Sequence, residues 1–412
     1  MSQLYGRWQR RTIERALKTR RVVLLVGARQ CGKTTLAGEM VSENIAYRTL
    51  DDLPARRVAE TDPGGFVKHA GTTLIIDEVQ KVPELLSAIK MQVDKDTRAG
   101  QYLLTGSADI QSSPGVRESL AGRIRKIRLR PLAQGEITEA SPDFLDRAFM
   151  REFRHPSRSY DRDAVLDMCL RGGFPEAMSL AETDRKEWYR DYVDAILERD
   201  LRELVRIRRR GAMVELIRAL AAWSGKFMDI STIASGLSIS RPTVESYINA
   251  LESLYVVERV RPWKRTDYAR VGSRPKLFMT DPGLMSSILG WNRNRVRMDA
   301  DRSGKAIETF MFNEIAAQSD ACGGKYELFH YRDRGKREID FLVEREDGAL
   351  LGIEIKAGSA IGKSDFRSLR WFRDNIAGNR PFTGVVLYSG ELAGSMGDRL
   401  WAVPFGTVWN QP

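Results

Sequence analysis

A glycine-rich segment at residues 27–34 has the residue types that hold the phosphates of a nucleotide. Its sequence, GARQCGKT, fits the pattern G-x-x-x-x-G-K-[ST]. The glycines let backbone N–H groups curve around a phosphate, Lys33 supplies a compact positive charge, and the Thr34 hydroxyl can reach Mg²⁺. The dipole of the helix that follows adds positive potential. The residues predicted to bind ATP here are Gly27, Ala28, Arg29, Gln30, Cys31, Gly32, Lys33, Thr34 and Thr35.

A second segment supplies the acids that such a site needs. Residues 74–76 are apolar and lead directly into Asp77 and Glu78, which is the Walker B form. We expect Asp77 to hold the Mg²⁺ shell and Glu78 to polarise the water that attacks the γ-phosphate. The two segments together predict Mg²⁺-dependent hydrolysis of ATP.

Two further segments carry candidates for sensing the γ-phosphate. Residues 103–107 form a predicted strand with hydroxyls at its end, and the sequence leaves open whether Thr105 or Ser107 is the sensor. Arg123 is a candidate for neutralising the charge that develops on the phosphoryl group, in its own subunit or in a neighbour's. The second alternative requires a homo-oligomer, and the sequence does not decide between them.

Two strands near the C-terminus carry acids and a lysine in a pattern typical of nucleases. Asp340 is embedded among apolar residues, and Glu354 and Lys356 are two residues apart and so lie on one face of a strand. This is the PD-(D/E)XK constellation, in which Asp340 and Glu354 bind Mg²⁺ or Mn²⁺ and Lys356 orients or activates the attacking water. Glu308, on a predicted helix, would be a further metal ligand or orienting acid.

Nucleic acid is the predicted substrate or partner of this region. The basic run at residues 332–337 could hold a nucleic-acid backbone just before Asp340. The alternative is a small α/β domain whose charged strand faces point toward water. Both interpretations stay open at this stage, and so does the question of whether such a domain cleaves DNA.

The nucleotide motifs need a parallel sheet to position them, and the first third of the chain alternates short apolar runs with helical stretches as such a sheet requires. Helices are predicted at 33–42 and 83–96. The predicted strands are Val22–Val26, Tyr47–Leu50, Leu74–Ile76, Tyr102–Thr105 and Ile124–Leu129. The predicted fold class is therefore α/β.

The middle of the chain has the element order of a winged helix. Three helices are predicted, at 213–224, at 230–237 and after Ser240, followed by two strands with Trp263, Lys264 and Arg265 near the tip of the wing. Acids at Glu245 and Glu252 on the exposed face of the third helix oppose contact with phosphates, whereas the basic wing favours it. DNA binding and protein binding both remain open.

The predicted domains are a P-loop core at 1–135, a helical connecting region at 136–212, a winged-helix-like domain at 213–298 and a nuclease-like domain at 299–412. The predicted element order of the last domain is helix, strand, strand, helix, strand. A chain of 412 residues is long enough for several cores.

Composition gives weaker indications. Lys and Arg exceed Asp and Glu by 66 − 55 = 11, which suits a polyanionic partner such as DNA. The sequence shows no apolar run of membrane-spanning length and no secretion signal at its start. It has 3 cysteines without paired spacing, so we expect a reduced, cytoplasmic location.

The ordered set of motifs resembles a large family of prokaryotic AAA-type ATPases that carry a C-terminal domain of unknown function, and the resemblance covers essentially the whole chain. It implies an AAA+ P-loop core, a winged-helix middle and a restriction-endonuclease-like C-terminal domain. The motifs that carry it are Gly27–Thr35, Leu74–Gln80, Leu103–Ser107, Ser119–Arg123, Arg171–Pro175, Leu197–Leu201, Lys276–Pro282, Ile339–Phe341 and Glu354–Lys356.

The resemblance assigns Lys33, Thr34, Asp77 and Glu78 to the nucleotide site and Asp340, Glu354 and Lys356 to the nuclease-like set. We expect an ATP-hydrolysing protein coupled to a nuclease-like domain that acts on DNA. The alternatives are an ATPase switch or scaffold without cleavage, and a regulator that reads DNA through the winged helix.

Overall fold

The computed structural model describes residues 4–106, 122–201, 210–265 and 274–409. The chain divides into two compact units. The smaller comprises Arg7–Pro131 with Ser253–Tyr255, and the larger comprises most of the remaining chain.

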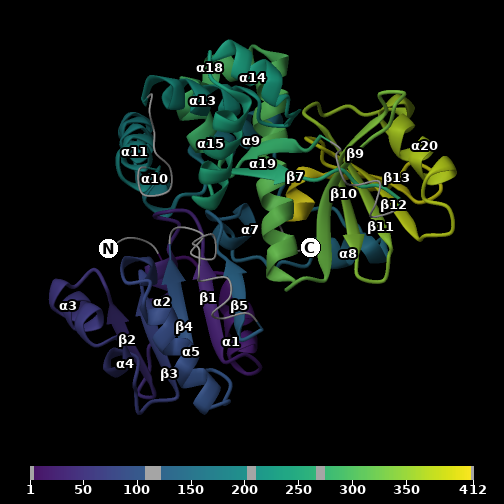
Figure 1. Ribbon diagram of the computed structural model, residues 1–412. Coiled ribbons are helices and arrows are strands. Elements are labelled where there is room, and N and C mark those ends of the chain that lie inside the picture. Colours follow the sequence, from purple (N-terminus) through teal and green to yellow (C-terminus); the bar gives the residue numbers. More distant parts are fainter. Residues whose placement is uncertain (1–3, 107–121, 202–209, 266–273, 410–412) are drawn as a thin grey trace. The chain divides into compact units, whose positions relative to one another are not determined.

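The smaller unit is built on a five-stranded parallel sheet with the strand order β2-β3-β4-β1-β5 (Figure 1). Its strands are β1 (Val22–Val26), β2 (Ile45–Thr49), β3 (Thr73–Asp77), β4 (Tyr102–Gly106) and β5 (Ile124–Arg128). The central strands β1, β3 and β4 are buried along their whole length, which is why each reads as a continuous apolar run rather than an alternating one. The predicted α/β class is confirmed.

Helices cover this sheet. α1 packs against β1 and β5, and α2 packs against β3 and β4. The helices of the unit are α1 (Gln9–Leu17), α2 (Lys33–Gly38), α3 (Leu53–Thr61), α4 (Pro63–Phe66) and α5 (Leu85–Lys95). α2 follows β1 directly after the glycine-rich segment, so the strand, loop and helix stand in the order that the motif requires.

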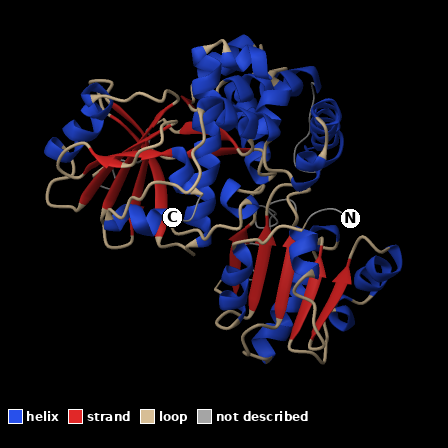
Figure 2. Ribbon diagram, turned by 180° about the vertical axis from the view of Figure 1, so that it is seen from behind, coloured by secondary structure: helices blue, strands red, loops and turns tan. Residues whose placement is uncertain are grey.

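The larger unit begins with a helical region, which Figure 2 shows in blue. Its helices before the C-terminal sheet are α7 (Gln134–Ile137), α8 (Phe144–Met150), α9 (Arg162–Arg171), α10 (Pro175–Ser179), α11 (Glu182–Ala195), α13 (Arg210–Ala222), α14 (Ile230–Gly236), α15 (Arg241–Ser253), α17 (Pro282–Ile288), α18 (Arg293–Arg297) and α19 (Ala300–Ala321). Several begin at an aspartate whose side chain accepts a backbone N–H of the first turn, as Asp281 does for α17 and Asp299 for α19.

A small antiparallel sheet accompanies the helices α13, α14 and α15, with one strand between α13 and α14 and two strands after α15. It has the order β6-β8-β7 and consists of β6 (Lys226–Phe227), β7 (Val257–Val260) and β8 (Lys276–Met279). This succession agrees with the element order of a winged helix, and the assignment to that fold stays a prediction. The segment between β7 and β8 includes residues 266–273, which lie outside the described residues.

The placement of Trp263 at the tip of a wing is wrong. Its side chain is 1% exposed and belongs to the core of the C-terminal sheet, where it contacts Phe372 and donates a hydrogen bond to Glu344. Its backbone N–H bonds to the carbonyl of His330 in the edge strand of that sheet. The segment after β7 therefore packs onto the C-terminal sheet, because burying the large apolar surface of the Trp263 indole is more favourable than leaving it in water.

The C-terminal sheet has six strands in the order β13-β14-β12-β11-β10-β9, whereas the sequence predicted three. The pairs β9–β10 and β10–β11 are antiparallel, whereas β11, β12 and β14 run parallel. α20 (Arg367–Asn375) packs against β10, β11 and β12, and α19 packs against β9 and β11. The strands are β9 (Tyr326–Arg332), β10 (Glu338–Arg345), β11 (Leu350–Lys356), β12 (Phe382–Tyr388), β13 (Gly394–Ser395) and β14 (Leu400–Pro404).

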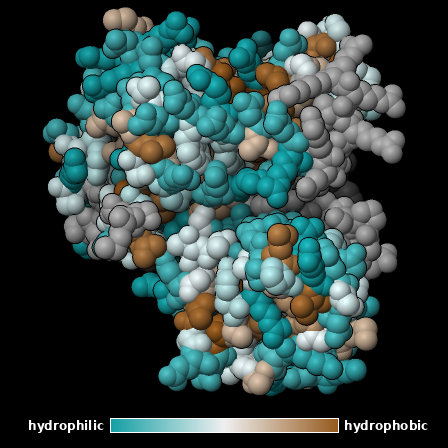
Figure 3. Space-filling model, turned by 90° about the vertical axis from the view of Figure 1, so that its left-hand side faces the viewer, coloured by the Kyte–Doolittle hydropathy of each residue, from teal (hydrophilic) through white to brown (hydrophobic). Residues whose placement is uncertain are grey.

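The surface is predominantly hydrophilic, with scattered apolar residues on the face that Figure 3 shows. Isolated exposed apolar side chains of this kind are normal for a globular protein. Among the described residues, no helix combines the length and the apolar character needed to cross a membrane.

Candidate functional site

The predicted nucleotide residues meet at the carboxyl edge of the five-stranded sheet. The glycine-rich loop follows the last residue of β1, Asp77 ends β3, and Thr105 lies near the end of β4. Because β4 lies between β3 and β1, Thr105 stands between the loop and the acid. The carboxyl edge of parallel strands is where open α/β sheets bind their ligands.

Backbone geometry explains the two glycines that frame the loop. A Cβ on Gly27 would lie 2.1 Å from the carbonyl oxygen of Leu129, and Gly32 has φ 100°, a conformation that L side chains rarely adopt. Between them the loop curls around the Lys33 side chain, which is 4% exposed. The ammonium of Lys33 donates to the carbonyl oxygens of Gly27 and Ala28 at 3.0 and 2.8 Å. This charge therefore sits inside the loop that would surround a phosphate.

Asp77 is fully buried and accepts hydrogen bonds from three hydroxyls. The Thr34 hydroxyl lies 3.2 and 3.0 Å from its two carboxylate oxygens, and the Tyr47 hydroxyl donates at 2.9 Å. The Thr105 hydroxyl is the third donor. Burial, and then the charge of Asp77, raises the pKa of Tyr47, which keeps its hydroxyl protonated. Sequence analysis missed Tyr47, because no motif marks it and only the pairing of β2 with β3 brings it to the acid.

Glu78 leaves the strand in the left-handed conformation, with φ 59°. Its backbone N–H donates to the Thr105 hydroxyl at 3.1 Å, and its carboxylate accepts a hydrogen bond from the Gln80 amide. Thr105 therefore bonds to both acids of the Walker B segment. The other sensor candidate, Ser107, lies outside the described residues, as do positions 119–121 before Arg123.

The remaining loop residues differ in exposure. Ala28 and Cys31 are buried, whereas Thr34 and Thr35 are exposed at the start of α2. Arg29 is partly buried and Gln30 is exposed with φ 58°. Sequence analysis also missed Arg7, whose guanidinium donates to the carbonyl oxygens of Cys31 at 2.8 Å and Arg130 at 2.6 Å.

The predicted action of Arg123 on a phosphate of its own subunit is wrong. Arg123 precedes β5, and the register pairs Ile124 with Val22, the first residue of β1. A strand of five residues spans about 16 Å, so Arg123 lies at the opposite edge of the sheet from the loop. Its guanidinium is paired with Asp94, with 2.5 Å between Nε and Oδ1. A role toward a neighbouring subunit stays a prediction.

The C-terminal acids lie around a lysine that sequence analysis did not select as a site residue. Lys276, at the start of β8, has a side chain that is 1% exposed. Its ammonium lies 3.0 Å from Glu308 of α19, 2.5 Å from Glu338 and 3.6 Å from Asp340, the last two on β10. The other oxygen of Asp340 accepts the backbone N–H of Ile355 at 2.9 Å. In the sequence, Lys276 begins both an apolar strand and one of the motifs that carry the family resemblance.

Burial and charge act in opposite directions in this acidic cluster, which we define as Glu308, Glu338, Asp340 and Glu354. Burial raises the pKa of Glu308 to about 7, although the Lys276 charge works against it. Burial, helped by the charge of Asp340, raises the pKa of Glu354 well above its usual range. For Lys276, burial favours a lower pKa, but the charges of Glu308, Asp340 and Glu338 outweigh it and raise the pKa.

The predicted Mg²⁺ or Mn²⁺ site at Glu308, Asp340 and Glu354 does not fit this arrangement. A cationic side chain already lies among the carboxylates, and as the side chains of the described residues are arranged with this lysine in place, no group of three or more His, Cys, Asp or Glu could hold a metal ion. Lys356 is 40% exposed and its ammonium is 3.9 Å from Asp365. The structure thus places Asp340 and Lys356 close enough to Glu354 for their charges to act on its pKa.

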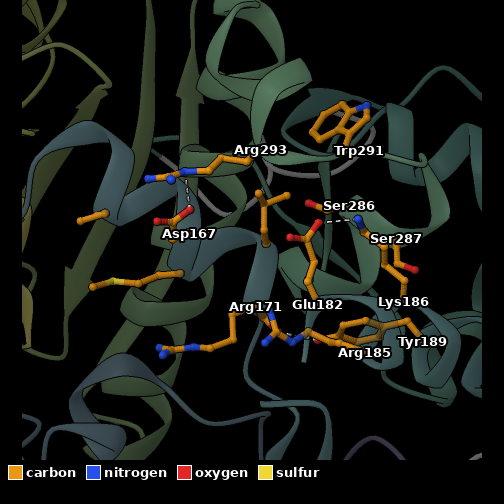
Figure 4. A pocket seen from close by; sticks show the side chains of 14 residues that line it. Asp167, Arg171, Glu182, Arg185, Lys186, Tyr189, Ser286, Ser287, Trp291 and Arg293 are labelled. Carbon is orange, nitrogen blue, oxygen red and sulfur yellow. Dashed lines mark hydrogen bonds and ion pairs between the residues drawn. The ribbon is translucent and has the colours of Figure 1, made fainter. Parts of the chain in front are cut away.

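A separate pocket of about 440 Å³ lies in the helical region between α9, α11 and α17 (Figure 4). Four of its charged side chains form ion pairs, since Arg293 lies 2.9 Å from Asp167 and Lys186 lies 2.5 Å from Glu182. Two further arginines bond to uncharged oxygens, Arg171 to the side chain of Gln134 and Arg185 to the backbone carbonyls of Ala177 and Leu180. None of the predicted nucleotide-binding, metal-binding or catalytic residues lines this pocket.

Comparison with known families divides the chain into three parts. Residues 19–138 match the family described as "AAA domain", residues 162–295 match "Domain of unknown function (DUF8612)", and residues 303–408 match "Domain of unknown function (DUF4143)". The first match agrees with the sheet and the loop described above. The match of residues 19–138 to an AAA domain supports ATP binding.

The chain is also similar to individual proteins. An uncharacterized protein of Mycobacterium tuberculosis and one of Mycobacterium bovis are each 28% identical to it over 399 residues, which cover 95% of this chain and 82% of theirs. Among solved structures, the Thermotoga maritima RuvB Holliday junction branch migration motor is 20% identical over 62% of this chain and 90% of its own, with a TM-score of 0.29. AMPPCP-bound DnaA from Aquifex aeolicus is 14% identical over 58% and 86%, with a TM-score of 0.29.

Proposed function

We propose that the protein is a Mg²⁺-dependent ATPase whose nucleotide state acts as a switch on the larger unit. One observation carries the proposal: a continuous set of hydrogen bonds joins the loop to both Walker B acids, from Thr34 through Asp77 and Thr105 to Glu78. An isolated strand that ends in two acids would need no such link to a glycine-rich loop. The AAA family match at residues 19–138 supports the same function.

The roles of the side chains follow from their positions. Lys33 exchanges its two carbonyl partners for the oxygens of the β- and γ-phosphates, where its positive charge gains more than it does from neutral carbonyls. Glu78 accepts a proton from the attacking water, or orients it, when the Gln80 amide releases its carboxylate. Because the Thr105 hydroxyl bonds to both residues, it fixes the Glu78 backbone relative to the Asp77 carboxylate.

The residues present fit a magnesium ion at this site. Mg²⁺ in nucleotide sites takes a hydroxyl and one or two carboxylates together with phosphate oxygens and water, and the Thr34 hydroxyl lies 3.0 Å from Asp77. When bound, the ion would neutralise the negative charge that develops on the phosphates. Thr34 and Asp77 are the residues that would hold it.

Replacing Glu78 by Gln tests the proposed hydrolysis. The amide keeps the shape and the hydrogen-bonding capacity of the side chain but cannot take a proton, so we expect ATP binding to persist. The hydrolysis rate should fall by about 10²–10⁴-fold, which is what a general base usually contributes. Steady-state phosphate release and equilibrium binding of ATP would separate the two effects. An unchanged hydrolysis rate would remove Glu78 from this role.

DNA is the proposed partner of the C-terminal domain, as a bound polyanion rather than as a cleavage substrate. Arg334 and Lys336 are exposed in the turn between β9 and β10, whereas Arg337 is paired with Asp333 at 3.0 Å. Adding duplex DNA to the ATP-binding measurement tests this proposal, because a switch that acts on a DNA-binding domain should change its affinity for ATP when DNA binds. An ATP affinity that DNA leaves unchanged at low salt would count against this coupling.

A further inference from the structure

The acidic cluster of the C-terminal domain has a cation of its own. We propose that the ammonium of Lys276 occupies the position of a divalent ion beside Glu308, Glu338 and Asp340, so that this domain binds no metal there and does not cleave nucleic acid. This inference does not depend on the proposed ATPase function, because none of these residues belongs to the nucleotide site.

Two side chains of β8 fix the position of the ammonium. Lys276 and Phe278 are two residues apart and so point to the same face of the strand. The ring of Phe278 stacks on Phe312 of α19 at 4.3 Å and contacts Phe341 of β10 at 5.6 Å between ring centroids. This aromatic contact anchors β8 against the helix and the strand that carry the acids.

The pairing of β10 with β9 positions Glu338 and Asp340 beside Lys276. The register shifts between Ile339 and Leu342, as in a β-bulge. A bulge re-aims side chains, and here Phe341 packs with Phe278 while the neighbouring Asp340 lies 3.6 Å from Lys276. Glu338, two residues before Asp340, is the nearest carboxylate to the ammonium.

The surroundings leave the ammonium little access to water. The ring of Phe227 of β6 lies 5.5 Å from it, and His330 of β9 packs edge-on against that ring. Burial, together with the charge of Lys276, lowers the pKa of His330 to about 3, so this imidazole adds no competing charge. On the α19 side, a Cβ on Gly225 would lie 3.0 Å from the carboxylate of Glu308. The cluster is thus packed closely around one cation.

Lys276 already supplies a positive charge to the cluster, and its ammonium faces Glu308, Glu338 and Asp340. A divalent ion would have to displace a buried ammonium that already has carboxylates at 2.5 and 3.0 Å.

Titration of the nucleotide-free, full-length protein with Mn²⁺ tests the inference. We expect the wild-type protein and its Asp340→Asn variant to give the same calorimetric trace. Lys276→Met should gain one bound Mn²⁺ per chain, with at least tenfold tighter binding than wild type, and Lys276→Met combined with Asp340→Asn should lose it. Lys363→Met, which removes an exposed lysine of the same domain, is the matched control and should resemble wild type.

Two results would overturn the inference. The first is a wild-type protein that binds one Mn²⁺ and loses it on Asp340→Asn, or that nicks supercoiled DNA with Mn²⁺ in an Asp340-dependent way. This comparison needs no change at Lys276 and so holds even if Lys276→Met does not fold. The second is a folded Lys276→Met protein that gains no ion. Neither outcome bears on ATP hydrolysis, so failure here is distinct from failure of the proposed function.

Discussion

At the scale of single residues, the two buried lysines among the described residues, Lys33 and Lys276, differ in what surrounds them. The ammonium of Lys33 donates to two uncharged carbonyl oxygens, whereas that of Lys276 lies among three carboxylates. A buried cation is stabilised far better by anions than by amide dipoles. Lys33 therefore gains by meeting an anionic phosphate, and Lys276 has no comparable gain available.

The buried carboxylate of Asp77 is held in place by hydrogen bonds. Three hydroxyls, from Thr34, Tyr47 and Thr105, donate to it from α2, β2 and β4. Hydrogen bonds of this kind compensate the loss of water around the charge and fix the direction of both oxygens. Two of the three donors stand where the motifs predict them, and Tyr47 is the addition that the structure makes.

Tyr47→Phe should therefore weaken the handling of Mg²⁺-ATP without disturbing the sheet. The change removes one hydrogen bond to a carboxylate, which is worth about 1.5 kcal/mol and corresponds to roughly tenfold weaker affinity. The measurement is the dependence of ATP binding on Mg²⁺ concentration. Tyr102→Phe is the matched control, since its hydroxyl bonds to the carbonyl of Val67 and not to Asp77. Equal affinities in the two variants would show that Tyr47 does not position the acid.

At the scale of elements, α19 connects the helical region to the C-terminal sheet through buried polar side chains. Glu314 accepts the backbone N–H of Gln134 at 2.7 Å, and one turn later Gln318 bonds to Phe144 and Val408. The spacing of four residues places both on one side of the helix. These contacts join three segments that are far apart in the sequence.

Glu314 makes this junction sensitive to pH. Burial raises the pKa of Glu314 from the ordinary value of 4.5 to about 8. Between these values the folded protein holds a proton that the unfolded chain releases, so the stabilisation is complete below pH 4.5 and is lost as the pH rises toward 8. The loss is about 1.4 kcal/mol per pH unit at most.

Glu314→Gln should remove this dependence, because an amide cannot titrate. We expect the variant to gain stability relative to wild type as the pH rises from 5 to 8, measured by urea denaturation at each pH. The difference between the two proteins isolates Glu314 from Asp281, Glu308 and Glu354, whose pKa values burial also raises. Glu346→Gln, at an exposed position, should show no such trend. A constant difference between wild type and Glu314→Gln across this range would contradict the account.

Elements with local contacts could be predicted from the sequence, whereas contacts between distant segments could not. The strand, loop and helix of the phosphate site are contiguous in the chain, and the strands β1, β3 and β4 are plain apolar runs, so local patterns suffice. Lys276 and Trp263 owe their environments to partners from 32 to more than 100 residues away. No local pattern marks such partners, which is why the metal site was expected and the lysine was not.

At the scale of the whole molecule, the chain itself links the nucleotide loop to the larger unit. Arg7 bonds to the carbonyls of Cys31 in the loop and of Arg130, which directly precedes Pro131 and Leu132. The N–H of Leu132 bonds in turn to the carbonyl of Gly173, where a Cβ would lie 2.3 Å from the Leu132 oxygen. In the proposed switch, a change in the conformation of the nucleotide loop would be transmitted to the larger unit along the chain from Arg130 to Leu132.

The central claim is that the loop at residues 27–34 binds ATP through Lys33, and equilibrium binding of ATP to the wild-type and Lys33→Ala proteins tests it most directly. Removing the ammonium takes away the only side-chain charge that the loop curls around, and the loop backbone keeps its own contacts. The account predicts saturable, Mg²⁺-dependent binding to the wild-type protein and loss of tight binding in the variant, with an unchanged melting profile showing that the fold persists. Equal affinity of a folded Lys33→Ala protein for ATP would contradict it.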